Sequence, residues 1–373
     1  MSWTHRERVL AALNHEETDR VPIDFGSAIA TTIYFTAYER LKAHLGIEGE
    51  PPAVCKRASR TVIPDPSVLE RFDVDTRFLG LGTYRGGGGH DIDEDHFVDE
   101  WGTTWEKRDT HPYMNVDGPF YNREPNLGDL EAHDWPDPDN PGYCRGLKDR
   151  AEAAHASGCA VVLNLPLGII HQGQFVRGYG EWLTDLYRYP EYVSRMMEIM
   201  TDHWVRVVNN ALDIVEDLVD IVFWGDDLGS QQTTLFSPDI YRQLIKPHHA
   251  RMFETLRARE VKITHHSCGA AAALFDDLIE MGVDAVNPVQ VNARNMDPQE
   301  LKREYGDRLA FWGGIDSQRI LPFGTPDEVR AEVRRIIGTL GEGGGYVLNS
   351  VHNIQPDVPP ENVVAMFDQA IAI

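Results

Sequence analysis

Short apolar segments alternate with longer segments of helical periodicity along almost the whole chain of 373 residues. Short apolar runs predict buried strands, and apolar residues that recur every three or four positions predict helices. We expect strands at 21–25, 76–81, 160–165, 220–224, 262–266, 285–289, 309–312 and 346–349. The strongest helical patterns cover 190–215, 238–259, 270–281, 326–340 and 360–371. Strands separated by helices are typical of βαβ units, so the sequence predicts an α/β fold with a parallel sheet.

The number of predicted strands favours a (β/α)8 TIM barrel, and one such barrel accounts for nearly the whole chain. The alternative is an open doubly wound sheet, but residues 26–28 (GSA) lack the glycine-rich phosphate loop of that fold. We predict a single barrel domain covering residues 1–373. The segment at about 84–137 is rich in Gly, Asp, His and Trp and lacks long helical periodicity. We interpret it as an insertion of loops and hairpins after the second strand, over the barrel mouth.

The net charge of the chain limits the classes of partner that it is expected to bind. The chain has 35 Lys and Arg against 59 Asp and Glu, a formal net charge of −24. Nucleic acids and anionic membranes are bound by clustered Lys and Arg, so neither partner is expected. Four cysteines are too few for a disulfide framework, and the N-terminal residues lack the apolar core of a signal peptide. We therefore expect a cytoplasmic protein that acts on a small molecule.

Helix starts and strand ends carry recognisable polar residues. Thr4 with Glu7 has the pattern of a capping box, and Ser237 and Thr325 each precede a proline at a first helical position. Barrel enzymes place their chemistry at the carboxyl ends of the strands. At or just after these ends we assign four residues to substrate binding: Asn164, His171, Trp224 and Asn287.

The sharpest motif is ITHHSCG at 263–269. Residues two apart on a strand point to the same face, so His266 and Cys268 can project together. Imidazole and thiolate suit zinc, which needs at least three protein ligands, and His352 after the last strand offers the third. The alternative is a buried cysteine beside a hydrogen-bonded histidine.

Three further residues are candidates for catalysis. Asp226 and Asp227 follow the strand before His266, so one could bind a cation while the other acts as a base or orients a histidine. Their alternative role is a solvated loop or a helix cap. Arg177 could hold a substrate carboxylate through two hydrogen bonds, or it could pair with a nearby acidic side chain.

These residues make the chain resemble the uroporphyrinogen decarboxylase superfamily. The motifs are DDLG at 226–229, SPDIY at 237–241, HSCG at 266–269 and FWGGID at 311–316, and the resemblance covers essentially the whole chain. It implies a (β/α)8 barrel and a homodimer. True uroporphyrinogen decarboxylases carry an arginine-rich segment after the first strand, whereas this chain has no arginine between Gly26 and Arg40. It also has GLG at 80–82, where the second strand of that enzyme ends in a catalytic aspartate. A polycarboxylate substrate is therefore electrostatically unfavourable here.

The resemblance is closer to the corrinoid-linked methyltransferases similar to methylcobamide:coenzyme M methyltransferase. Those enzymes bind zinc through His-x-Cys and a distant cysteine near the last strand. His266 and Cys268 match the first part, whereas residues 349–353 (NSVHN) place His352 where the distant cysteine is missing. The chain shows no cobalamin-carrying domain, so a corrinoid would be supplied by a separate protein.

Three functions follow from these observations. The leading hypothesis is a zinc-dependent methyltransferase that moves a methyl group between a small substrate and a corrinoid protein or thiol acceptor. The second is a metal-independent decarboxylase or lyase that uses Asp227, His352 and Arg177 on a small carboxylated substrate. The third is a barrel that binds a small ligand without chemistry.

Overall fold

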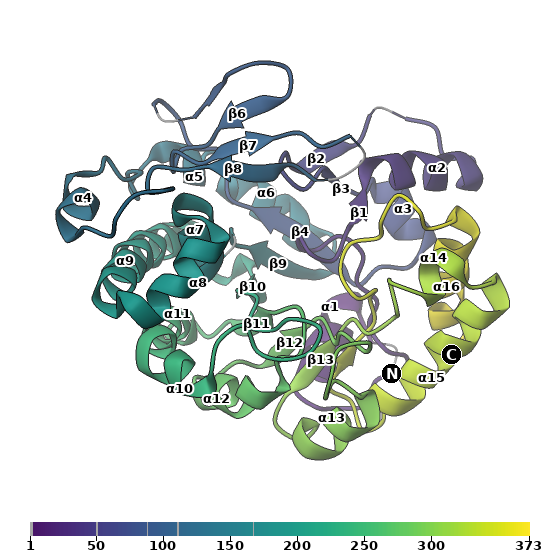
Figure 1. Ribbon diagram of the computed structural model, residues 1–373. Helices are drawn as coiled ribbons and strands as arrows, with labels where there is room; N and C mark the ends of the chain where they lie inside the picture. The colour runs from purple at the N-terminus through teal and green to yellow at the C-terminus, as the bar shows by residue number, and fades with distance from the viewer. Residues whose placement is uncertain (1–2, 50, 88, 110–111, 167) are drawn as a thin grey trace.

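The computed structural model describes residues 3–49, 51–87, 89–109, 112–166 and 168–373. These ranges form an α/β fold around a seven-stranded parallel sheet with the order β14-β13-β12-β11-β10-β9-β4. Figure 1 shows helices surrounding the strands. The strands are β4 (Thr76–Gly80), β9 (Ala160–Asn164), β10 (Ile221–Gly225), β11 (Lys262–His266), β12 (Ala285–Asn287), β13 (Ala310–Trp312) and β14 (Tyr346–Val347). The predicted α/β class and parallel sheet are confirmed.

The first predicted strand, at 21–25, is reduced to a short extended segment between the two edges of the sheet. Ile23 forms a single parallel bridge with Leu348, directly after β14. The carbonyl of Ile23 accepts a hydrogen bond from the amide of Asp75, directly before β4. The sheet is therefore curved strongly enough for one segment to contact both edges. The prediction of a complete (β/α)8 barrel is therefore confirmed only in part: seven strands form the parallel sheet, and the segment at 21–25 contacts both of its edges without forming an eighth strand.

Side chains alternate between the interior of the curved sheet and the helical layer, as the pleat requires. Ile221 and Phe223 belong to an interior cluster with Trp312, whereas Val222 and Trp224 belong to the cluster beneath the helices. This parity decides which residues at the strand ends face the interior.

The three residues predicted to cap helix starts do so in the structure. Thr4 and Glu7 form the capping box of α1, and Ser237 and Thr325 accept hydrogen bonds from the first turns of α10 and α15. The helices before β10 are α1 (His5–Leu13), α2 (Phe35–Leu45), α3 (Pro66–Arg71), α4 (Leu127–Ala132), α5 (Pro141–Cys144), α6 (Leu147–Ala156), α7 (Ile169–Arg177), α8 (Tyr179–Arg188) and α9 (Pro190–Val215). Those after β10 are α10 (Pro238–Ile240), α11 (Lys246–Arg257), α12 (Phe275–Glu280), α13 (Pro298–Tyr305), α14 (Ile320–Phe323), α15 (Pro326–Leu340) and α16 (Pro360–Ile371).

The continuous helix predicted at 238–259 is wrong in one respect. A π-helical turn at Tyr241–Ile245 separates α10 from α11. Pro247 accounts for the interruption, because proline lacks an amide hydrogen and its ring clashes with the carbonyl four residues earlier. None of the described helices is both long enough and apolar enough to cross a membrane.

Two small antiparallel sheets accompany the parallel sheet. The first has the order β1-β3-β2 and consists of β1 (Ile33–Tyr34), β2 (Ala53–Lys56) and β3 (Thr61–Ile63). The second has the order β5-β6-β7-β8 and consists of β5 (His90–Asp91), β6 (His96–Val98), β7 (Thr104–Glu106) and β8 (Met114–Asp117). Figure 1 shows the second sheet at the top of the view, beside β2. The division into one domain with an insertion at 84–137 stays a prediction.

Candidate metal centre

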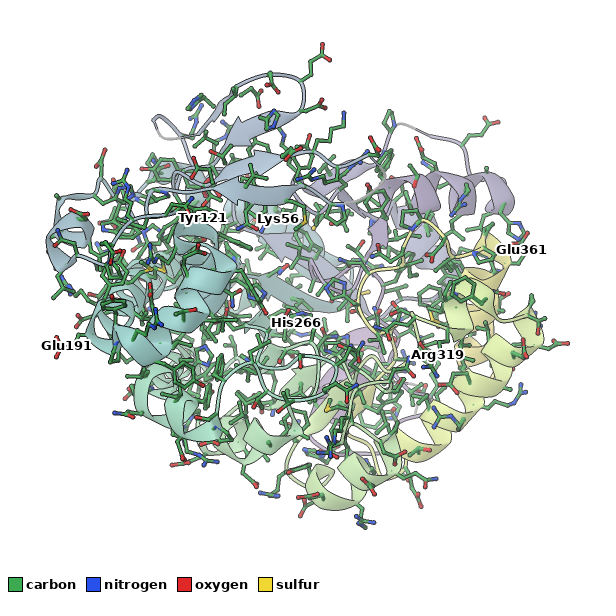
Figure 2. The ribbon with its side chains drawn as sticks, viewed as in Figure 1. Lys56, Tyr121, Glu191, His266, Arg319 and Glu361 are labelled. Carbon is green, nitrogen blue, oxygen red and sulfur yellow. The ribbon has the colours of Figure 1, made fainter. Side chains whose placement is uncertain are left out.

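The three predicted metal ligands lie together at the carboxyl end of the parallel sheet. His266 ends β11, Cys268 follows it, and His352 lies in the loop after β14. One ligand atom from each side chain lies within 4.8 Å of the other two. His266 is buried, and the other two residues are partly buried. Figure 2 shows His266 near the centre of the ring of helices, far from Glu191 and Glu361 at the rim.

These donors fit zinc. Zn²⁺ binds imidazole nitrogen and thiolate sulfur at about 2.0 and 2.3 Å in a tetrahedral arrangement, which separates the two ligand atoms by about 3.5 Å. Nε2 of His266 lies 3.6 Å from Sγ of Cys268. Three protein ligands leave the fourth position open, as in catalytic zinc sites. The role of the three residues as ligands stays a prediction with which this geometry agrees.

The ionisation of the three groups suits a cation site. Burial lowers the pKa of His266 and lowers that of His352 to about 4. Both imidazoles are therefore neutral at pH 7 and keep a lone pair for a metal. Burial and the negative charge of Asp227 raise the pKa of Cys268 well above its ordinary value. The thiol is therefore protonated unless a cation lies beside it.

Asn287 orients His266 from the neighbouring strand. The two residues are partners in the register of β11 and β12, and Oδ1 of Asn287 accepts a hydrogen bond from Nδ1 of His266 at 2.8 Å. This contact leaves Nε2 facing Cys268. Asn287 was expected to bind substrate, but its side chain is fully buried behind His266 and lines neither of the two cavities described below. Its position is that of a residue that supports a ligand.

Asp227 faces the predicted ligands. Its Oδ1 accepts a hydrogen bond from the backbone amide of Cys268 at 2.8 Å and lies 3.7 Å from Nε2 of His266. Burial opposes ionisation of this carboxyl group, but the hydrogen bond and positive charge of His171 outweigh burial and lower its pKa. Asp227 is therefore a carboxylate beside the predicted metal ligands.

Asp226 points away from the centre and holds the start of α7. Its fully buried carboxylate accepts hydrogen bonds from the backbone amides of Ile170 and His171, from Nδ1 of His171 and from Nε2 of His249. A helix N-terminus favours such an anion. A Cβ atom on Gly168 would lie 2.2 Å from this carboxylate, so the position requires glycine. A direct catalytic role for Asp226 does not match this placement, because four donors occupy its oxygens.

His171 lies between the two aspartates. Its Nδ1 is 3.0 Å from Oδ1 of Asp226, and its Nε2 is 3.5 Å from Oδ2 of Asp227. Burial alone would lower its pKa, but the two carboxylates raise it to about 10. His171 is therefore an imidazolium ion at neutral pH.

The structure does not bring Arg177 to the site. Its guanidinium group is buried, pairs with Asp185 at 2.7 Å and donates to the backbone carbonyls of Phe120 and Arg123. The alternative role of pairing with a nearby acid is the one observed. Arg177 lines neither of the two cavities described below, so it does not hold a substrate carboxylate beside His266.

The other two predicted substrate residues differ in placement. The ring of Trp224 lies on the helical side of β10, against His249 and Phe253 of α11, with ring centroids 5.4 and 5.5 Å away. Trp224 and Phe223 both line the smaller cavity described below, but only the side chain of Phe223 belongs to the interior cluster. Asn164 faces the interior, where its Oδ1 accepts a hydrogen bond from the amide of Ile29 at 2.7 Å.

Two adjoining cavities lie at this end of the sheet. The smaller, of about 500 Å³, contains Asp227, His171, His266 and His352 and has mainly apolar walls that include Phe175 and Phe223. The larger, of about 620 Å³, lies under the antiparallel sheet and is lined by Lys56, Glu100 and Trp105 among others.

Sequence reasoning missed several of these residues. His249 carries no motif that assigns it to the site, yet it is buried and its Nε2 bonds to Oδ2 of Asp226. Lys56 and Glu100 carry no motif and lie far apart in the sequence, so no sequence signal pointed to them.

Comparisons with known proteins agree with this architecture. The uroporphyrinogen decarboxylase (URO-D) family model matches residues 167–372. Uroporphyrinogen decarboxylase of Neisseria meningitidis is 26% identical over 186 residues, which cover 50% of this chain and 49% of that protein. The enzyme of Thermus thermophilus is 29% identical over 171 residues, or 45% of each chain. The chain thus spans about half the length of the curated relatives that it matches.

A solved methyltransferase from Methanosarcina mazei superposes with a TM-score of 0.66 at 16% identity, covering 100% of this chain and 99% of the other. At that identity the likeness concerns the fold, which the two chains share over their whole lengths. The family match, which contains both His266 and Cys268 as well as His352, is the more specific finding. Because it covers more than half of the residues, the chain belongs to the uroporphyrinogen decarboxylase family.

Proposed function

We propose that the chain is a zinc-dependent methyltransferase that moves a methyl group between a small substrate and a thiol or a corrinoid carried by a separate protein. The observation that carries this proposal is the convergence of His266, Cys268 and His352 within 4.8 Å at the carboxyl end of the sheet. When bound there, zinc would lower the pKa of a coordinated thiol or withdraw charge from a departing oxygen.

The protein's own groups would control protons and water around the transfer. Asp226 and Asp227 hold His171 as a cation that lines the smaller cavity. Its Nε2 hydrogen would stabilise negative charge that develops on a leaving group, and it would supply the proton when that group departs. Asp227 also fixes the backbone of Cys268. Apolar walls, including Phe175 and Phe223, would exclude water from the reacting methyl group.

A decarboxylase acting without a metal is the second candidate, since the two curated relatives described above are uroporphyrinogen decarboxylases. In that reaction a carbon–carboxylate bond breaks, carbon dioxide leaves, and the carbon that retains the electron pair must be protonated. The imidazolium of His171 is the available proton donor in the smaller cavity. Arg177 has no part in this version, because its partners hold it elsewhere.

Metal analysis of protein purified without an affinity tag separates the two candidates. We expect stoichiometric zinc in the wild type and loss of zinc in Cys268→Ala and His266→Ala. Cys144→Ala, which changes a thiol on α5 outside both cavities, should keep its zinc. The wild type should transfer methyl groups from methylcobalamin to small thiols, and His266→Ala should not. Zinc content that is negligible, or unchanged by Cys268→Ala, would refute the proposal, and release of carbon dioxide by that metal-free protein would favour the second candidate.

A further inference from the structure

The larger cavity is a separate chamber that adjoins the metal centre. It lies between the ends of β4 and β9 and the antiparallel sheet that contains β6 and β7. Its wall is shared in part with the smaller cavity, because Lys56, Trp105 and Phe175 line both. A molecule held in the larger cavity can therefore extend past Lys56 towards His266.

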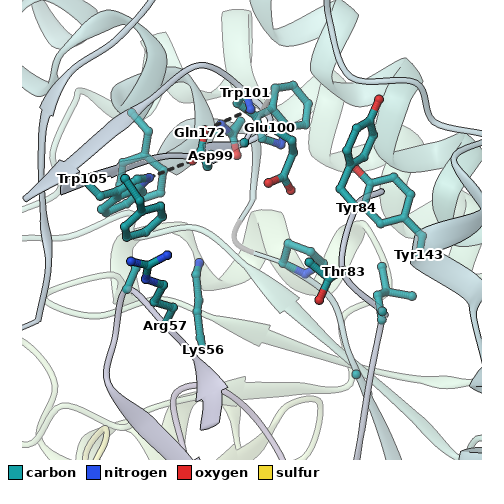
Figure 3. Close-up of a pocket in the computed structure, with 18 of the residues that line it drawn as sticks. Lys56, Arg57, Thr83, Tyr84, Asp99, Glu100, Trp101, Trp105, Tyr143 and Gln172 are labelled. Carbon is teal, nitrogen blue, oxygen red and sulfur yellow. Dashed lines mark hydrogen bonds between the residues drawn. The ribbon is translucent and has the colours of Figure 1, made fainter. Parts of the chain in front are cut away.

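Two opposite charges face this chamber without pairing. Figure 3 shows Lys56 entering from one side and the carboxylate of Glu100 pointing in from the other. Within the described residues the Lys56 ammonium group makes no hydrogen bond or ion pair, and the Glu100 carboxylate receives only the hydrogen bond of its own backbone amide. Burial lowers the pKa of Lys56 and raises that of Glu100, while each charge favours ionisation of the other.

The neighbouring charges, by contrast, are occupied. Arg57 pairs with Asp91 at 2.5 Å and stacks on the ring of Phe97 at 4.2 Å. Asp99 accepts hydrogen bonds from the backbone amides of Trp101 and Thr103 and from Nε1 of Trp105. These groups hold the antiparallel sheet in place, which leaves Lys56 and Glu100 as the charges available to a ligand.

The two available charges select the ligand's chemistry. A simple anion would pair with Lys56 but would leave Glu100 unpaired beside a second negative charge. A simple cation would pair with Glu100 but would leave Lys56 unpaired beside a second positive charge. A molecule that carries both charges satisfies both groups.

We propose that the larger cavity binds the charged end of an amino-acid-like zwitterion, with its carboxylate on Lys56 and its ammonium group on Glu100. The side chain of this ligand extends past Lys56 into the apolar cavity that contains His266. Recognition of the zwitterion follows from the chamber alone, whereas the reaction of a methylated side chain at the metal centre rests on the proposed function.

Matched sets of probes test the two charges separately by calorimetry. L-Methionine carries both charges, 3-(methylthio)propylamine lacks the carboxylate, and 4-(methylthio)butanoate lacks the amine. O-Methyl-L-tyrosine, 4-methoxyphenethylamine and 3-(4-methoxyphenyl)propanoate form a bulkier set of the same design. In at least one set we expect the amino acid to bind about tenfold or more tightly than both analogues, since each charge-assisted contact contributes that order of affinity.

Variants assign each contact. Lys56→Met should weaken binding of the amino acid about tenfold without weakening binding of the amine, and Glu100→Gln should weaken the amino acid without weakening the carboxylate analogue. Lys148→Met, which removes an exposed lysine paired with Glu216, should change neither affinity. Equal melting temperatures will show that the variants are folded.

Two results would overturn the inference: neither amino acid binds more tightly than its analogues, or Lys56→Met and Glu100→Gln both bind like the wild type. His266→Ala separates this inference from the proposed function. We expect it to lose methyl transfer but to bind the amino acid within about threefold of the wild type, because both charged contacts remain. Zinc-free protein that still binds the zwitterion would refute the proposed function and keep the inference, and stoichiometric zinc without such binding would do the reverse.

Discussion

Nδ1 of His266 donates a hydrogen bond to Oδ1 of Asn287 across the neighbouring strands β11 and β12, over 2.8 Å. The bond settles which imidazole nitrogen faces Cys268 and holds the ring in that orientation. It also links the predicted metal site to the rigid sheet, because both residues are buried and paired in register.

Replacing Asn287 by leucine should weaken zinc binding about 10- to 100-fold, because the imidazole loses the partner that orients it. Competition with a chromophoric chelator measures this affinity. Asn362→Leu is the control, since Asn362 is an equally buried asparagine whose amide bonds to the carbonyls of Leu321 and Gly324. Unchanged zinc affinity in Asn287→Leu would contradict the orienting role.

The proposed zinc ion has three protein ligands if His352 is one of them and two if it is not. We expect His352→Ala to bind zinc at least about tenfold more weakly, whereas His352→Cys should retain stoichiometric metal because a thiolate is an equally good zinc ligand. Cobalt substitution offers the readout, since the absorption of the cobalt protein should show a second thiolate in His352→Cys. If His352→Ala binds zinc as tightly as the wild type does, His352 is not a ligand.

Gly168→Ala should destabilise the protein by about 2 kcal/mol, since the new methyl group would overlap the buried carboxylate of Asp226. Urea unfolding measures the loss. Gly180→Ala is the matched control, because a Cβ atom at Gly180 in α8 meets nothing within 4 Å. That substitution should be neutral or should stabilise the protein by about 0.5 kcal/mol. Equal stabilities of the two variants would show that Asp226 can move at little cost.

His203 should make the protein sensitive to mild acid. Burial lowers the pKa of this histidine to about 4, and its Nδ1 donates to the carbonyl of Pro136 at 3.0 Å. In the unfolded chain its pKa is about 6.5. Between these values the unfolded state binds a proton that the folded state does not, so stability falls as the pH drops from about 6.5 to about 4.

From pH 7 to pH 5 this one group should remove about 2 kcal/mol of unfolding free energy. His203→Gln should lose that much less than the wild type over the same interval, measured by urea unfolding at both pH values. A difference in unfolding free energy between the two proteins at pH 7 does not affect the test, because the comparison concerns how much each protein loses between pH 7 and pH 5. Parallel losses in both proteins would show that His203 is protonated without cost in the folded state.

Much of the fold could be predicted from local sequence patterns. The alternation of strands and helices predicted the parallel sheet, and hydroxyl residues before helical segments predicted the starts of α1, α10 and α15. The same local logic placed His266 and Cys268 together, because residues two apart at the end of a strand share a face whatever surrounds them. These features depend on backbone geometry and on side chains that are close in the sequence, so short segments of sequence are enough to predict them.

Tertiary structure decided the roles of the other candidates. Every residue of β10 is buried, so hydrophobicity did not show that Phe223 faces the interior while Trp224 faces the helices. After β10 the side chain of Asp226 bonds to the start of α7 and that of Asp227 bonds to the backbone of Cys268, although the two residues are adjacent. Lys56 and Glu100 face the same cavity only because the antiparallel sheet folds over the ends of β4 and β9. Such pairings are set by how distant segments pack, and short-range periodicity contains no information about that packing.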